Sequence, residues 1–172
     1  MEAKAIIKFV LSEKEIQHYK EEEYGITEMD AYHFLSKNQY WRCFDWNESI
    51  DIISDIISFV EKRILNLRGE TLSISQHKLI KEYSKSPMFL EKGGWMQYIL
   101  YAISSILQHY QLNLVDCIFS DDAYRIMICT EANSLRLCEL PLVDYCFKIH
   151  KDSLCRWQRW ILYQDIQWQL RP

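Results

Sequence analysis

Glycine and proline are scarce in this chain of 172 residues, which has four glycines and three prolines. Phosphate-binding loops need several glycines at fixed offsets, so that the backbone can approach the phosphate closely. The patterns G-x-G-x-x-G and G-x-x-x-x-G-K are both absent. The sequence therefore argues against the nucleotide chemistry that such loops support.

Long apolar runs are missing as well. The first residues, MEAKAIIKFVLSEKE, lack the small-residue cleavage pattern that follows the apolar run of a signal peptide. A membrane-spanning helix needs about 20 mostly apolar residues. The most apolar segment, 95–110, is interrupted by polar side chains, namely Gln97, Ser104, Ser105, Gln108 and His109. We therefore expect a soluble protein in the cytoplasm that does not bind membranes.

Closely spaced metal ligands are also absent, since the sequence has no C-x-x-C and no H-x-x-x-H pair. From Cys117 to Cys155, successive cysteines are separated by twelve, nine, eight and nine positions. This spacing fits one buried cysteine per strand of a β-meander in a reducing cytosol. We predict structural cysteines, no metal site and no cofactor.

The composition favours one core. Apolar residues make up 49% of the chain and aromatic residues 14%. A chain of this length buries roughly 68 to 70% of its unfolded surface when it folds. The sequence contains no repeat and no long linker, so we predict a single α+β domain over 1–172.

The N-terminal segments predict a strand followed by two helices. Residues 3–11, AKAIIKFVL, are rich in β-branched and aromatic side chains, which favour a strand. Ser12 is a good N-cap for a helix that ends near Gly25. A second helix is expected from Thr27 to about Lys37.

The middle of the chain predicts two long helices. After Asn47, a good N-cap, apolar residues recur three and four positions apart until Gly69 closes the helix. A broad apolar stripe predicts a central helix over 95–110. Between the two, we expect a shorter helix over 75–84 and an irregular stretch over 86–94.

From Leu114 onward, short apolar runs separated by turn residues predict a meander of strands. The runs are LVDCIF (114–119), YRIMICT (124–130), LRLCEL (135–140) and VDYCFKI (143–149). The closing segment, 153–170, favours a helix, although its apolar spacing also fits a strand. The predicted fold is α+β, with an N-terminal strand and several helices packed on a mostly antiparallel C-terminal sheet.

Negative charge is concentrated in the first third of the chain. Residues 1–55 hold twelve Asp and Glu against six Lys and Arg, a net charge of −6, whereas residues 56–172 hold twelve against fourteen, or +2. A surface of one sign attracts partners of the other sign and repels nucleic acid if it is acidic. The alternative is that these carboxylates belong to solvated helix faces and turns. We predict a partner-binding surface formed by Glu21, Glu22, Glu23, Glu28 and Asp30, extended by Asp51 and Asp55.

The sequence offers few candidates for catalytic residues. His150 lies five positions before Cys155, close to basic residues that would lower a thiol pKa, and these two are the candidates for a base and a nucleophile. The alternative is a buried structural cysteine beside a solvated basic turn. We favour this alternative and predict no catalytic residue.

Aromatic residues gather over 40–46 and over 157–168. Tryptophan and tyrosine are enriched at binding hot spots, but most belong to cores, and we favour a core role. Arg156 and Arg159 lie within the second group, yet a pI of about 5.7 and the lack of a basic stripe argue against direct nucleic-acid binding.

Net acidity, a compact soluble chain and the lack of a catalytic pattern together resemble the profile of bacterial immunity proteins, including those of contact-dependent growth inhibition. Such proteins are small and cytoplasmic, and they inactivate a cognate toxin domain by covering its active site or another essential surface. The resemblance implies tight stoichiometric binding to a basic toxin domain such as a nuclease, and it assigns no role to any residue. Two alternatives are a small cytosolic enzyme and an interaction subunit of a larger assembly.

Overall fold

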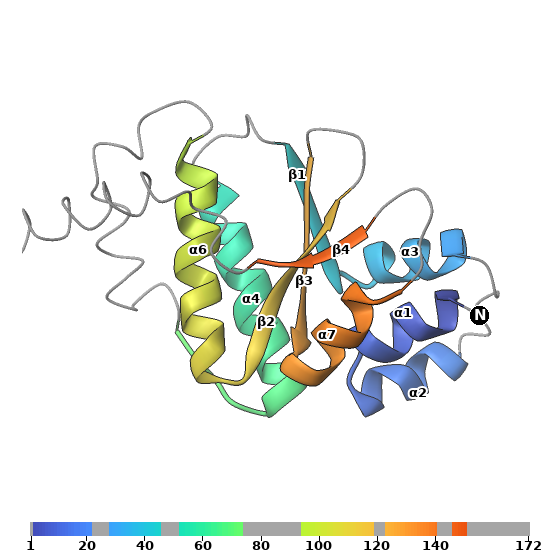
Figure 1. Ribbon diagram of the computed structural model, residues 1–172. Coiled ribbons are helices and arrows are strands. Elements are labelled where there is room, and N and C mark those ends of the chain that lie inside the picture. Colours follow the sequence, from blue (N-terminus) through green and yellow to red (C-terminus); the bar gives the residue numbers. More distant parts are fainter. Residues whose placement is uncertain are drawn as a thin grey trace, which may run out of the picture.

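The computed structural model describes residues 2–21, 28–45, 52–73, 94–118, 123–140 and 146–150 (Figure 1). These residues form six helices: α1 (Glu2–Val10), α2 (Glu13–Glu21), α3 (Glu28–Lys37), α4 (Ile53–Arg68), α6 (Gly94–His109) and α7 (Glu131–Cys138). They also form four strands: β1 (Trp41–Asp45), β2 (Leu112–Ile118), β3 (Ala123–Thr130) and β4 (Cys146–Ile149). The predicted α+β fold is confirmed.

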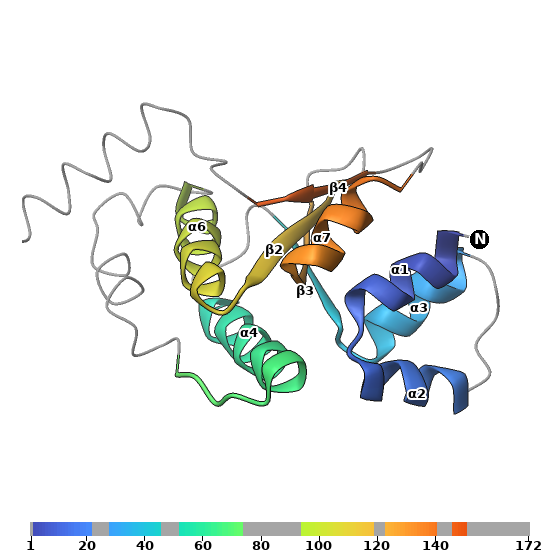
Figure 2. The ribbon, with the colours of Figure 1, turned by 60° about the horizontal axis from the view of Figure 1, so that its bottom comes forward.

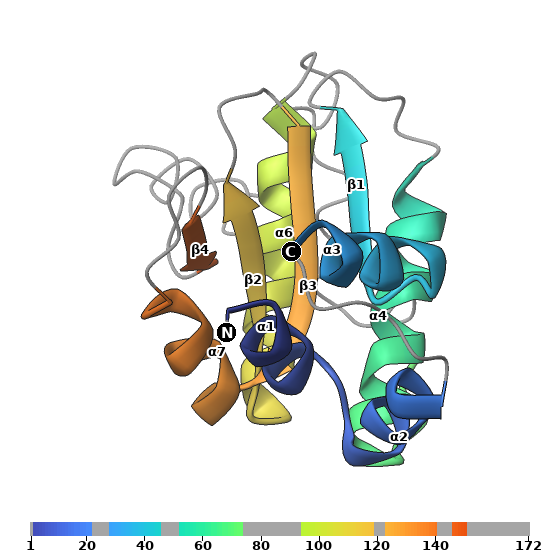
Figure 3. The ribbon, with the colours of Figure 1, turned by 90° about the vertical axis from the view of Figure 1, so that its right-hand side faces the viewer.

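The strands form one antiparallel sheet in the order β1-β3-β2-β4, and Figure 3 shows β3 between β1 and β2. In the central pair, Val115 of β2 lies opposite Met127 of β3. Trp41 of β1 pairs with the other side of Met127, and Phe147 of β4 lies opposite Cys117 of β2. The first of the described strands is therefore an edge strand of this sheet.

Helices cover both faces of the sheet (Figure 2). Helices α4 and α6 pack on one face, and α1, α3 and α7 pack on the other. Because side chains alternate along a strand, β3 contributes Ile126 and Ile128 to the first core and Met127 and Cys129 to the second. Residues 126–129 of β3 are buried on both faces of the sheet, and all four are apolar, as expected of such a segment.

The predicted strand over 3–11 is wrong, because these residues form helix α1. Ile6, Ile7 and Val10 are buried together against the sheet and α3, whereas Lys8 is exposed. Val10 lies four positions after Ile6 and three after Ile7, which places all three on one side of a helix, whereas in a strand Ile7 would face away from Ile6 and Val10. Packing of this stripe therefore overrides the strand preference of β-branched residues.

The predicted strand over 135–140 is wrong as well, because α7 occupies 131–138. Thr130 ends β3 and caps the helix, since its hydroxyl accepts a hydrogen bond from the N–H of Asn133 at 3.3 Å. Ser134 and Leu137, three positions apart, form the buried side of α7. The N-cap Thr130 and the three-residue spacing of Ser134 and Leu137 indicate a helix. Thr130 and Ser134 lie before the run LRLCEL, so this run alone does not show these signals.

Strand β1 is an element that the sequence analysis does not predict. It is five residues long, and Phe44 is its one fully buried residue. Such a short run, with Arg42 and Asp45 in it, shows too little alternation to indicate a strand. The core role expected for the aromatic residues of this region is confirmed for Tyr40 and Phe44.

The remaining predicted helices and strands agree with the structure where it describes them. Helices α2, α3, α4 and α6 are confirmed, and Gly69 closes α4 with a φ of 71°. The runs at 114–119 and 124–130 overlap β2 and β3, which begin two residues and one residue earlier, and the end of the run at 143–149 forms β4. The predicted N-cap Asn47 is wrong, because Ile52 is the N-cap of α4. Gly94, the last residue of the predicted irregular stretch 86–94, begins α6. The rest of that stretch, the helix over 75–84 and the segment 153–170 lie outside the described residues.

Helix α3 ends in a left-handed turn without a glycine. Gln39 has a φ of 57°, a conformation that costs a residue with a Cβ roughly 1 to 2 kcal/mol. The N–H of Gln39 donates to the carbonyl of Ser36 at 3.0 Å, and the N–H of Tyr40 donates to the carbonyl of Leu35 at 2.8 Å. These are the two hydrogen bonds of a Schellman motif, in which glycine usually occupies the left-handed position.

Gln39→Gly is expected to stabilise the protein by about 0.5 to 1 kcal/mol, because glycine adopts this conformation without steric cost. The change is measured as the free energy of unfolding in urea. Gln108→Gly, in an exposed position of α6, is a matched control and is expected to lower stability by roughly 0.5 to 1 kcal/mol. A Gln39→Gly variant that loses stability would contradict the interpretation.

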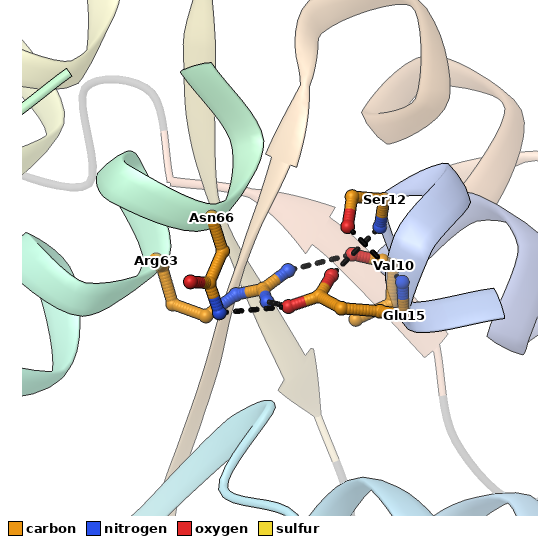
Figure 4. Close-up of polar contacts among 5 residues, drawn as sticks. All are labelled: Val10, Ser12, Glu15, Arg63 and Asn66. Carbon is orange, nitrogen blue, oxygen red and sulfur yellow. Dashed lines mark hydrogen bonds and ion pairs between the residues drawn. The ribbon is translucent and has the colours of Figure 1, made fainter. Parts of the chain in front are cut away.

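One buried arginine connects the two helical layers. Arg63 of α4 is 1% exposed, and Figure 4 shows its guanidinium extending toward Val10 and Glu15. Nη1 donates to Oε1 of Glu15, and Nη2 donates to the carbonyl of Val10 at 2.8 Å. The guanidinium carbon lies 5.2 Å from the centroid of the Tyr40 ring, within the range of a cation–π contact.

Glu15 is fixed by a capping box at the start of α2. The N–H of Ser12 donates to Oε2 of Glu15 at 2.7 Å, and the N–H of Glu15 lies 3.4 Å from the Ser12 hydroxyl that accepts from it. The amide of Asn66 donates to Oε1 at 2.9 Å, the same oxygen that Arg63 contacts. These hydrogen bonds offset part of the cost of removing the carboxylate from water.

Arg63→Met is expected to destabilise the protein by about 3 to 5 kcal/mol, because Glu15 would remain buried without its cation. The double variant Arg63→Met, Glu15→Leu should recover most of this loss, since no buried charge is left unpaired. Urea unfolding measures both. Lys62→Met, at the exposed neighbouring position of α4, serves as control and should change stability by no more than about 0.5 kcal/mol.

Candidate functional site

The structure divides the predicted acidic surface between two regions. Helix α2 ends at Glu21, and α3 begins at Glu28 with Asp30 in its first turn, so these backbone positions lie at the same end of one helical layer (Figure 1). Asp55 lies in the first turn of α4, which covers the opposite face of the sheet. The other predicted residues, Glu22, Glu23 and Asp51, lie outside the described part of the chain.

Asp55 borders a small hollow between α4 and the edge strand β1. The hollow has a volume of about 70 Å³ and is lined by Arg42, Cys43 and Phe44 of β1 and by Ile52, Asp55 and Ile56 at the start of α4. Phe44 and Ile56 are buried and form an apolar floor, whereas Asp55 is exposed at the rim. Ligand pockets for small molecules are several times larger, so this hollow fits a single side chain.

His150, the candidate base, is oriented by a carboxylate. Its Nδ1 lies 2.7 Å from Oδ2 of Asp116 on β2, and the residue is 4% exposed. The backbone N–H of His150 donates to the carbonyl of Leu114 at 2.9 Å, and the backbone carbonyl of His150 accepts from the hydroxyl of Ser104 at 2.6 Å. A carboxylate that holds one imidazole nitrogen is a common way to orient a general base. The same contacts also fasten β4 to β2 and α6.

Asp116 is a residue that the sequence analysis does not single out. In the sequence, Asp116 can be recognised as the one charged residue in the apolar run LVDCIF, where the residues on either side of it are buried. In the register of the sheet, Asp116 lies opposite Lys148. Cys155, the candidate nucleophile, lies outside the described residues.

Two of the described cysteines are deeply buried in the centre of the sheet. Burial raises the pKa of the Cys117 thiol and of the Cys129 thiol to about 12, from an ordinary value of 9.0. The expectation of one buried cysteine per strand is confirmed for these two residues on β2 and β3. It is wrong for Cys138, which lies on helix α7, and for Cys146, which is exposed on β4.

Within the described ranges, no group of three or more His, Cys, Asp or Glu side chains is arranged to hold a metal ion. In the same part of the chain, no helix combines the length and the apolar character that crossing a membrane requires.

Comparisons with protein-family models, with curated proteins and with solved structures find no match for this chain. Function is therefore inferred from the residues and their geometry.

The raised thiol pKa values predict a loss of stability at alkaline pH. Unfolded thiols ionise near pH 9, while Cys117 and Cys129 keep their protons in the folded state up to about pH 12. The unfolded state therefore binds fewer protons between these values, and the free energy of unfolding falls by up to about 1.4 kcal/mol per pH unit for each thiol.

Urea unfolding between about pH 9 and pH 11, within the range in which the folded and unfolded thiols differ in protonation, measures the slope. The Cys117→Ala, Cys129→Ala variant should show a shallower decline than the wild type. The matched variant Cys43→Ala, Cys146→Ala removes two exposed thiols and should retain the wild-type slope. Equal slopes in the two variants would show that the buried thiols do not contribute.

Proposed function

We propose that this chain is a small acidic binding protein that neutralises a cognate protein toxin by tight stoichiometric binding, in the manner of bacterial immunity proteins. The partner is a basic toxin domain such as a nuclease, and binding takes place in the cytoplasm. In this proposal the chain itself contacts neither nucleic acid nor membrane.

The uneven distribution of charge is the observation that supports this proposal. Residues 1–55 carry a net charge of −6, whereas the rest of the chain carries +2. The described parts of this region form α1, α2 and α3, which lie together on one side of the sheet, the edge strand β1, and the start of α4 on the other side of the sheet (Figures 1 and 2). Of the net charge of −6, the described residues carry −2, and Glu22, Glu23, Glu48 and Asp51, which lie outside the described residues, carry the remaining −4.

A charge excess of this kind has a defined physical effect on binding. It steers an oppositely charged partner during diffusion and raises the association rate by a factor of about 10 to 1,000. Screening limits this effect to distances of about 8 to 10 Å at physiological salt. An acidic surface also resembles nucleic acid in charge, so it suits the substrate-binding surface of a nuclease.

The first test is capture of a partner by the tagged protein from its native cytosol, followed by an activity assay on the isolated complex. The proposal predicts a basic protein bound at one to one whose toxic activity is lost in the complex. Retention of full toxic activity at saturating amounts of this chain would rule out neutralisation.

The second test locates the steering charge. The variant Glu21→Lys, Glu22→Lys, Glu23→Lys should slow association with the captured partner by about tenfold or more at low salt, measured by stopped-flow fluorescence. Its matched control is Glu70→Lys, Glu131→Lys, Glu139→Lys, which alters the net charge equally at exposed positions outside the first third. Equal effects of the two variants would indicate that net charge alone matters.

A small cytosolic enzyme is the second candidate function, and the pair formed by His150 and Asp116 is the observation that favours it. An enzyme would neutralise its target at far less than one molecule per target molecule, and Cys155→Ser would abolish this activity. Stoichiometric neutralisation that survives Cys155→Ser excludes the enzyme.

A further inference from the structure

The edge strand β1 presents one side of its backbone outside the sheet. It lies at one end of the strand order, and among the described residues it pairs with β3 alone. In an antiparallel ladder, alternate residues direct their N–H and C=O groups away from the paired neighbour. Such an edge can accept a further strand from another chain.

The other edge strand, β4, is less suited to a basic partner. It has four residues, and its exposed side chains include Lys148. A lysine on an edge strand opposes strand addition, and it would repel a cationic segment. Strand β1 also carries a cation, the half-buried Arg42, but it has the exposed carboxylate of Asp45 at its end.

The hollow beside β1 lies where a side chain of an added strand would point. Phe44 of β1 faces α4 and α6, because it belongs to the core on that face of the sheet. Every second side chain of a strand added to β1 would face the same way, next to Phe44 and the first turn of α4. The apolar floor made by Phe44 and Ile56 fits the aliphatic stem of a lysine or arginine.

The charged groups around the hollow fit the same occupant. Asp55 lines the hollow and is exposed, and Asp45 is exposed at the end of the same edge strand. Asp55 at the rim can accept the charged end of a lysine or arginine whose stem lies in the hollow. Arg42 lines the hollow too, and its N–H groups can donate to backbone carbonyls of an added segment.

We infer that the open edge of β1 and the hollow beside it form the docking site for an extended segment of the partner, with a lysine or arginine directed at Asp55. This inference rests on the proposed function and specifies where the toxin domain attaches. Backbone hydrogen bonds to β1 provide affinity, and the hollow selects the basic side chain.

The experiment uses the complex with the partner captured in the test of the proposed function. Asp55→Lys is expected to weaken binding by roughly tenfold or more, mainly through faster dissociation, because it places a cation against the basic side chain. Glu70→Lys is the matched control, since it reverses an exposed charge just after α4 and should leave the dissociation rate unchanged. Urea unfolding of both variants shows that each is folded.

Two native cysteines provide a footprint that needs no substitution. Cys43 lines the hollow and is exposed, whereas Cys146 is exposed on the opposite edge strand. In the complex, N-ethylmaleimide should label Cys43 several times more slowly than in the protein alone, and it should label Cys146 at the same rate. Mass spectrometry of the peptides reads both sites in one sample.

The outcomes separate this inference from the proposed function. A neutralising complex in which Asp55→Lys binds normally and Cys43 stays reactive overturns the docking site and leaves the proposed function intact. Protection of Cys43 in the protein alone, together with a dimer mass, overturns the inference in favour of a second copy at this edge. If no partner is captured under any condition, the proposed function itself fails.

Discussion

The contact of the Arg63 guanidinium with Glu15 and Val10 is the constraint on which the packing of the two helical layers depends. Arg63 belongs to the layer of α4 and α6, and its partners belong to the opposite layer. A buried cation is costly unless it is paired and hydrogen-bonded, so the layers are stable together only in the geometry that provides both. Because the guanidinium also lies over the ring of Tyr40, the residue before β1, the same contact fixes where the edge strand begins.

Other polar side chains also connect separate elements, and they join helices to the sheet or to its turns. The amide of Asn113 on β2 donates to the hydroxyl of Ser134 on α7 at 2.7 Å. Arg68 at the end of α4 donates to the carbonyls of Tyr110 and Gln111, which lead into β2. Apolar packing is not directional, whereas each of these contacts is satisfied in one arrangement only. They therefore select one orientation for helices that the apolar cores alone would leave less defined.

The sequence predicted the elements that carry their own end signals and missed those that tertiary packing decides. Ser12 and Gly69 mark the ends of α2 and α4, and both are used as expected. Helix α1 was predicted as a strand because local preference favours that state, and only the burial of one helical face on the sheet reverses it. The acidic residues were identified by type, but the sequence gives no indication that Asp55 faces β1 across a hollow. That juxtaposition depends on the register of a strand too short to recognise.

The position of β1 in the sheet also affects how the chain folds during synthesis. Trp41 acquires its sheet partner only after Met127 has been made, and the face that α1 and α3 cover is formed by β2 and β3. Because synthesis proceeds at about 5 to 20 residues per second, the apolar faces of the first three helices stay unburied for several seconds before β2 and β3 are made. Long-range strand pairing of this kind slows folding and exposes such surfaces to aggregation. The acidic N-terminal third therefore cannot complete its fold as a separate unit, and its net charge helps to keep the waiting chain in solution.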